Sequence, residues 1–228
     1  MTVTDLPDSI VVGSWQRDFK IIGDELRQLS LRRTVFDRLD AEIVRTTNEA
    51  VAGLALDQFL RPIYAEAQAA LIRRLVDRDE RSVSLRNLLT DMMRHHEVLT
   101  RERHVREMHQ RWIDSGFVGG TDAAAHESFN AFAGKDQPFV PRGQLQTLVD
   151  QIVADMRVVT THVNKFVAHR DRVQPASMNW GQLNGALDRV SEHYSTVGLM
   201  LFPELDDNGD LLIDGLDWPA AFRDLFVT

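Results

Sequence analysis

The chain has 228 residues, which is enough to bury a substantial core in one domain, and its shares of hydrophobic (43%) and charged (26%) residues are ordinary for a globular protein. The absence of cysteine excludes a disulfide framework, a thiolate zinc site and a cysteine nucleophile. The formal net charge of −8 argues against broad, non-specific binding of nucleic acid, which needs clustered positive charge to displace counterions.

Residues 14 to 78 are predicted to be helical, because their apolar side chains recur at steps of three and four residues. The pattern starts with Trp15, Phe19, Ile22 and Leu26. A second apolar face, from residue 56 to residue 75, suits a helix that packs centrally in a bundle. Within this stretch, Pro62 is expected to kink the helix or to mark its boundary.

A charged break from Asp77 to Ser84 precedes the next predicted helix. The hydroxyl of Ser82 or Ser84 can accept a hydrogen bond from the free backbone N–H groups at the start of that helix. The helix should begin at about Leu85 and continue to Trp112, unless it is interrupted near Leu99 and Thr100.

The middle of the chain, at about 115–143, is rich in glycine and proline. It is expected to be a long surface connection with a short Ala-rich helix from Thr121 to Ala133. We interpret it as a connection within a single domain of residues 1–228, because the helices before it still have faces that later helices must cover.

Two clear helices should follow, one from Gln144 to near Arg172 and one from about Trp180 to Leu201. A tail at about 203–228 is expected to cap the bundle with a short helix near Trp218 to Phe226. Strict alternation of apolar and polar residues is nearly absent. The predicted fold class is therefore an all-α, multi-helix bundle.

The string from Asn164 to Asp171, Asn-Lys-Phe-Val-Ala-His-Arg-Asp, places a dense polar cluster at the end of an apolar helix face. His169 can exchange a proton near neutral pH, and Lys165 and Arg170 can hold a phosphate. Asp171 can orient a partner group. The alternative is a solvated helix end at which the histidine helps to satisfy the terminal carbonyl groups.

This string resembles the abortive-infection branch of the HEPN superfamily, whose members often carry Asn or Asp, Lys, and then Ala-His-Arg-Asp near the end of a long helix. Residues 61–89 and the stretch from Asp217 to Phe222 are similar more weakly, so that roughly half of the chain is covered. The resemblance implies a HEPN-like bundle that acts in defence or stress response as a homodimer. It also implies metal-independent RNA cleavage, in which histidine moves a proton and arginine stabilises phosphate charge.

HEPN ribonucleases typically have an arginine with a polar neighbour a few residues before the histidine. Here Val163 and Asn164 stand where that arginine would precede His169. Arg157 and His162 have a suitable spacing and are secondary candidates, although their alignment with the Ala-His-Arg-Asp string is lost. The resemblance therefore implies RNA cleavage or RNA binding at a degenerate site. A catalytically silent helical interaction or structural protein is the alternative from a different functional class.

Two other polar regions have ordinary explanations. Histidines and arginines between residues 94 and 111 can form an RNA surface or a metal site, but the glutamates among them favour a salt-bridged, solvated helix face. The stretch from Asp206 to Asp217 is similar to a calcium-binding loop, yet Leu211 stands where such a loop needs glycine, which favours an acidic turn. No metal or other cofactor is assigned, and no Gly-rich loop for a nucleotide cofactor occurs.

The start of the chain, Met-Thr-Val-Thr-Asp-Leu-Pro-Asp, is acidic and lacks the basic and apolar regions of a signal peptide. No window reaches the roughly 18 uninterrupted apolar residues of a membrane span. We therefore expect a cytoplasmic protein with no membrane contact, which forms a homodimer and has RNA as its candidate partner.

Overall fold

The structure is a computed structural model, and it describes residues 8–46, 51, 53–54, 56–116, 120–167 and 178–201. Within these residues the chain forms eight α-helices with short 3-10 and π-helical turns between them. The β-pairing in the same ranges amounts to one isolated bridge, between Thr100 and Phe139. The prediction of an all-α, multi-helix bundle is therefore confirmed.

The bounds of the elements follow the chain order. The α-helices are α1 (Asp8–Thr46), α3 (Arg61–Leu75), α4 (Leu85–Arg94), α5 (Arg101–Ser115), α6 (Asp122–Ala133), α7 (Arg142–Asp155), α8 (Arg157–His162) and α9 (Trp180–Leu201). The π-helical turns are η2 (Leu56–Leu60) and η4 (Val163–Val167), and η3 (His96–Val98) is a 3-10 turn.

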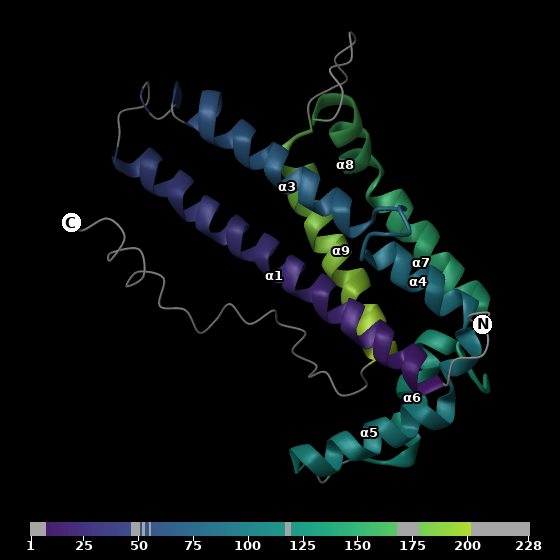
Figure 1. Cartoon of the computed structure of the whole chain (residues 1–228). Coiled ribbons are helices and arrows are strands. Elements are labelled where there is room, and N and C mark those ends of the chain that lie inside the picture. Colours follow the sequence, from purple (N-terminus) through teal and green to yellow (C-terminus); the bar gives the residue numbers. More distant parts are fainter. Residues whose placement is uncertain are drawn as a thin grey trace.

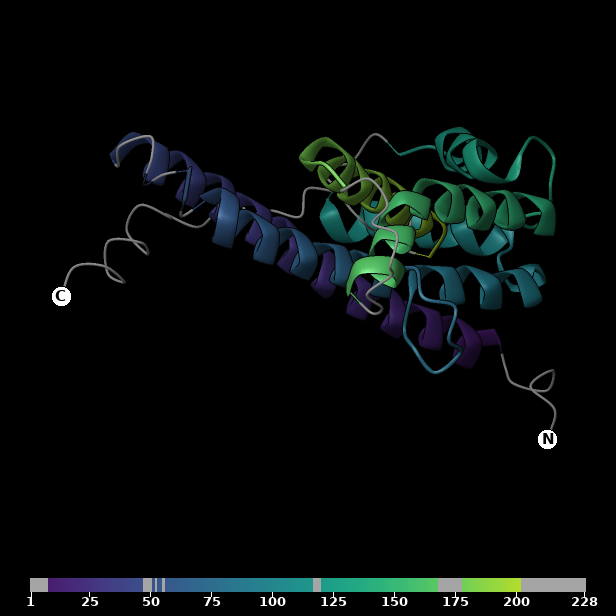
Figure 2. The ribbon, with the colours of Figure 1, turned by 90° about the horizontal axis from the view of Figure 1, so that it is seen from above.

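The long helix α1 runs along the whole bundle, and α3 lies beside it in the opposite direction (Figure 1). The helix α9 packs against both, and α4 and α7 form a neighbouring pair. The pair of α5 and α6 lies at the end of the bundle where α1 begins. At the opposite end, α1 and the start of α3 project past the other helices as a two-helix arm (Figure 2).

The predicted apolar face of α1 is confirmed, because its large side chains are buried. These are Trp15, Phe19, Ile22 and Leu26. They join one core cluster with side chains from α3, α4, α7, α8 and α9. Burying each such side chain contributes about 1.5–3 kcal/mol to folding, so this face of α1 is a major source of the stability of the bundle.

Several helix starts lie where their capping residues predict. Ser84 Oγ accepts a hydrogen bond from the backbone N–H of Asn87 at 3.1 Å, which confirms the cap of α4. Thr100 caps α5 after the predicted interruption, and Thr121 caps α6. Pro62 lies in the first turn of α3, where its missing N–H group costs no hydrogen bond, so it marks a helix boundary.

The prediction of one continuous helix from Gln144 to near Arg172 is wrong. The helix breaks at Met156, which has φ −85° and ψ 0° and a fully buried side chain. The break has a packing reason, since α7 lies against α4 whereas α8 lies against α3. After α8, the backbone widens into the π-helical turn η4, and the predicted end near Arg172 lies outside the described residues.

The predicted connection at about 115–143 contributes to the core as well as to the surface. Phe129 and Ala133 of α6 are buried in the core cluster, together with Val140. The predicted tail helix near Trp218 to Phe226 and the acidic stretch from Asp206 to Asp217 lie outside the described residues. Among the described helices, none combines the length and the apolar character that a membrane span requires.

Candidate functional site

The polar string that the sequence singles out begins in the turn η4. Asn164 and Lys165 lie in this turn, and both are exposed. His169, Arg170 and Asp171 lie outside the described residues, so their positions relative to the other candidates are not described. A π-helical turn is rare and often occurs at functional sites.

The secondary candidates, Arg157 and His162, lie at the two ends of α8. Arg157 is exposed, whereas His162 is half-buried beside an apolar cavity between α3 and α9. Burial lowers the pKa of His162, and the negative charge of Glu66 opposes this shift. Asn164 lines a different cavity, so the structure does not bring Asn164 and His162 together in one site.

The cavity beside Asn164 is lined by arginines. It has a volume of about 270 Å³ and lies between the end of α3, the start of α4 and the α7–α8 break. Arg73, Arg78 and Arg86 contribute to its wall. Arg73 donates a hydrogen bond from Nε to Oδ1 of Asn164 at 3.0 Å, which joins the cavity to η4.

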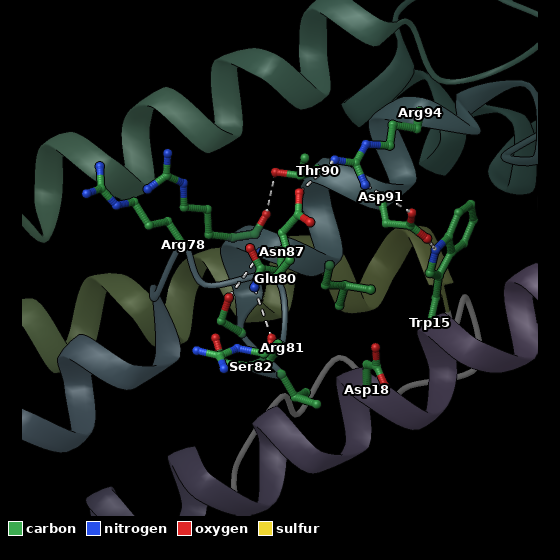
Figure 3. A pocket seen from close by; sticks show the side chains of 14 residues that line it. Trp15, Asp18, Arg78, Glu80, Arg81, Ser82, Asn87, Thr90, Asp91 and Arg94 are labelled. Atoms are coloured by element: carbon green, nitrogen blue, oxygen red, sulfur yellow. Dashed lines mark hydrogen bonds and ion pairs between the residues drawn. The ribbon is translucent and has the colours of Figure 1, made fainter. Parts of the chain in front are cut away.

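A second polar cavity, of about 350 Å³, adjoins the first because Arg78 and Arg86 line both. Figure 3 shows its charged side chains around the loop before α4, with Trp15 at one side. Two further arginines, Arg81 and Arg94, lie on its wall. We call Arg73, Arg78, Arg81, Arg86 and Arg94 the arginine surface.

Carboxylates neutralise part of the arginine surface. Arg81 pairs with Asp79 at 2.6 Å, and Arg94 lies 3.6 Å from Glu80 and 3.9 Å from Asp91. Arg78 and Arg86 have no carboxylate within ion-pair distance in the described part of the chain. Their guanidinium groups are therefore the members of the surface best suited to an added anion.

Two acidic side chains, Asp18 and Asp91, also line the second cavity. Asp91 accepts a hydrogen bond from Trp15 Nε1 at 2.8 Å. Burial raises the pKa of Asp18, against a lowering by Arg17, and the charge of Asp91 adds to the rise. An anion in this cavity is therefore expected nearer to Arg78 and Arg86 than to Asp91, whose negative charge would repel it.

The arginine surface was not nominated from the sequence. Residues 61–89 resemble the earlier helices of the HEPN family only weakly, and arginine is common in the whole chain, so no spacing marks Arg78 or Arg86. The available signal was their position on either side of the break between α3 and α4. Only the packing of α7 and α8 against this break places both beside Asn164.

The histidine-rich region between residues 94 and 111 includes both charged side chains in ion pairs and one buried histidine. Arg103 pairs with Glu107 at 2.6 Å, as expected of a salt-bridged face. His104, in contrast, is buried beside Phe129 and Phe132. Over the described ranges, no three His, Asp or Glu side chains gather in a way that can hold a metal ion.

Comparison of this chain with protein-family models, curated proteins and solved structures gives no match.

Proposed function

We propose that this protein binds single-stranded RNA through the arginine surface, and that the Ala-His-Arg-Asp string, which follows η4 in the sequence, acts on the bound RNA as in HEPN-like proteins. The observation that carries the proposal is the hydrogen bond from Arg73 to Asn164, because it ties an arginine-lined cavity to the turn that leads into His169. Arginine presents a planar fork of donors that matches phosphate. A local cluster of this kind is compatible with a net charge of −8.

In this proposal the RNA backbone lies on Arg78 and Arg86, and Lys165 and Arg170 add positive charge at the scissile phosphate. His169 accepts the proton of the ribose 2′-hydroxyl or donates one to the leaving oxygen, with Asp171 orienting it. The arginines stabilise the charge that develops on the phosphate. Two copies of the chain, as a homodimer, supply two such strings to one RNA.

A purified sample in excess chelator tests this activity directly. Wild type should cleave mixed single-stranded RNA, and His169→Ala should lose cleavage while it keeps RNA binding and the melting temperature. His126→Ala is the matched control, because His126 is exposed on α6, away from the arginine surface. RNA binding without cleavage by wild type would assign a degenerate, binding-only site.

The second candidate is a catalytically silent helical interaction protein, and one observation favours it. Five large apolar side chains at the end of the two-helix arm are half or more exposed. They are Val44, Val51, Leu54, Phe59 and Ile63. If wild type neither binds nor cleaves RNA, a role in protein association is the better account.

A further inference from the structure

The apolar cavity beside His162 has the size and lining of a small-ligand site. Its volume is about 370 Å³, and it lies between the start of α3, the end of α8 and the start of α9. Its apolar wall consists of Pro62, Ala65, Met178, Trp180 and Leu183. Ligand pockets are typically of this size, with mostly apolar walls and a few polar groups that fix orientation.

Trp180 is held in place before any ligand arrives. Its ring stacks with the rings of Phe36 and Tyr64, each at 5.4 Å between centroids. Asn179 and Gln182 exchange hydrogen bonds of 2.9 and 3.0 Å, which form a capping box that fixes the start of α9. A rigid aromatic wall loses little entropy when a flat ligand packs on it.

Polar groups that line the cavity can form hydrogen bonds with the edge of a flat ligand. His162 has one donor and one acceptor in its neutral form, and Glu66 supplies a carboxylate acceptor. The amide oxygen of Asn179 accepts the Gln182 N–H, and its NH₂ group is a donor. Donors and acceptors around an apolar floor suit a heteroaromatic ring.

The position of the cavity ties it to the arginine surface. His162 directly precedes η4, and Met178 follows the part of the sequence that contains His169. Along α3, Ala65 of the cavity and Arg73 of the arginine surface are eight residues apart, which is about 12 Å of helix. An RNA strand with a phosphate in the cavity that Arg73, Arg78 and Arg86 line can therefore reach the apolar cavity with a nearby base.

We infer that the cavity against Trp180 takes one unstacked base of the bound single-stranded RNA. This inference rests on the proposed function and names a base-binding subsite for it. Single-stranded RNA is commonly recognised by aromatic side chains that stack its splayed bases and by polar groups that contact the base edges. The ligand class is thus a nucleobase that is carried on a phosphate backbone.

Labelling with 5-fluorotryptophan and ¹⁹F NMR tests the subsite in the intact chain. The chain has four tryptophans, and Trp180→Phe assigns the Trp180 resonance. Adenosine monophosphate and a single-stranded oligoadenylate should shift this resonance, whereas ribose 5-phosphate, which lacks the base, should not. The Trp112 resonance should stay unchanged, because Trp112 lies on α5 at the other end of the bundle.

Two variants extend the test to affinity. Trp180→Leu should weaken oligoadenylate binding about tenfold, as expected for loss of one base stack, without changing its salt dependence. Trp180→Leu also removes part of the aromatic cluster with Phe36 and Tyr64. Ala65→Leu therefore serves as a second variant, because the larger side chain at this half-buried position of the wall takes up cavity volume and leaves the cluster intact. Both should retain the wild-type circular dichroism spectrum.

The outcomes separate the subsite from the proposed function. If RNA binds wild type with strong salt dependence but the Trp180 resonance does not move and both variants bind equally well, the subsite is wrong and the proposed function stands. If RNA does not bind but adenosine monophosphate moves the Trp180 resonance, the proposed function fails, and the cavity is a site for a free nucleotide and not for an RNA base.

Discussion

Arg73 and Asn164 are 91 positions apart in the sequence, yet the guanidinium of one donates to the amide of the other at 3.0 Å. This contact crosses from the last turn of α3 to the turn η4. It joins the cavity that Arg78 and Arg86 line to the turn that precedes His169 in the sequence. Arg78, Arg86 and Asn164 thus line one cavity although they come from separate parts of the sequence.

Two glycines of α1 give a matched test of the packing. A Cβ on Gly23 would lie 2.1 Å from the hydroxyl oxygen of Tyr194, whose ring is stacked on Phe19 at 4.0 Å. Gly23→Ala should therefore lower the free energy of unfolding by about 1–3 kcal/mol. Gly13→Ala, in the same helix with open space around its Cβ, should raise it by about 0.5–1 kcal/mol. Urea denaturation measures both, and equal effects would contradict the described packing of α1 on α9.

The buried His104 should make stability depend on pH. Burial lowers its pKa from 6.5 to about 4, with further lowering by the charges of Arg103 and Arg101. The unfolded chain therefore binds the proton of His104 more readily than the folded chain does. The contribution of neutral His104 to the free energy of unfolding is fully present above pH 6.5. It is lost as pH falls from 6.5 toward about 4, by up to about 3 kcal/mol.

Chemical denaturation at several pH values, compared with His104→Leu, isolates this contribution from that of the carboxylates. The variant should lose less stability than wild type over the same pH range. Identical pH profiles for the two proteins would mean that His104 is not buried as described.

The exposed apolar side chains of the arm are available for protein association under either candidate function, and the homodimer is the association that the proposed RNA cleavage requires. Light scattering of wild type should give twice the chain mass of 26.0 kDa. Phe59→Ser combined with Ile63→Ser should give the single-chain mass, because both side chains are more than half exposed at the end of the arm. Ile113→Ser is the control, since Ile113 is even more exposed but lies on α5. A monomeric wild type would remove the homodimer from the account.

Local sequence signals predicted most of the fold because the causes are local. The spacing of Trp15, Phe19 and Ile22 is enough to define a buried helix face, and Ser84 is enough to define a helix start. The break at Met156 could not be predicted in this way. Methionine favours continuation of a helix. The break has its cause in tertiary packing, because α7 before it packs on α4 whereas α8 after it packs on α3.

The candidate site was predicted only in part for the same reason. The string from Asn164 to Asp171 is contiguous, so the sequence displays it. The arginine surface joins residues from α3, the following loop and α4 with Asn164 of η4, and only packing brings them together. The apolar cavity likewise joins His162 to Trp180 across elements that the sequence separates.

Binding of single-stranded RNA to wild type and to Arg78→Ala/Arg86→Ala, followed by fluorescence anisotropy over a range of salt concentrations, tests the central claim most directly. The control is Arg38→Ala/Arg106→Ala, which removes the same charge from exposed positions outside both polar cavities. We predict salt-dependent binding by wild type and by the control. The Arg78/Arg86 variant should bind more weakly, with a salt slope smaller by about 1.4, as for the loss of two phosphate contacts on a single strand. Equal loss in both double variants, or no RNA binding by wild type, would contradict the account.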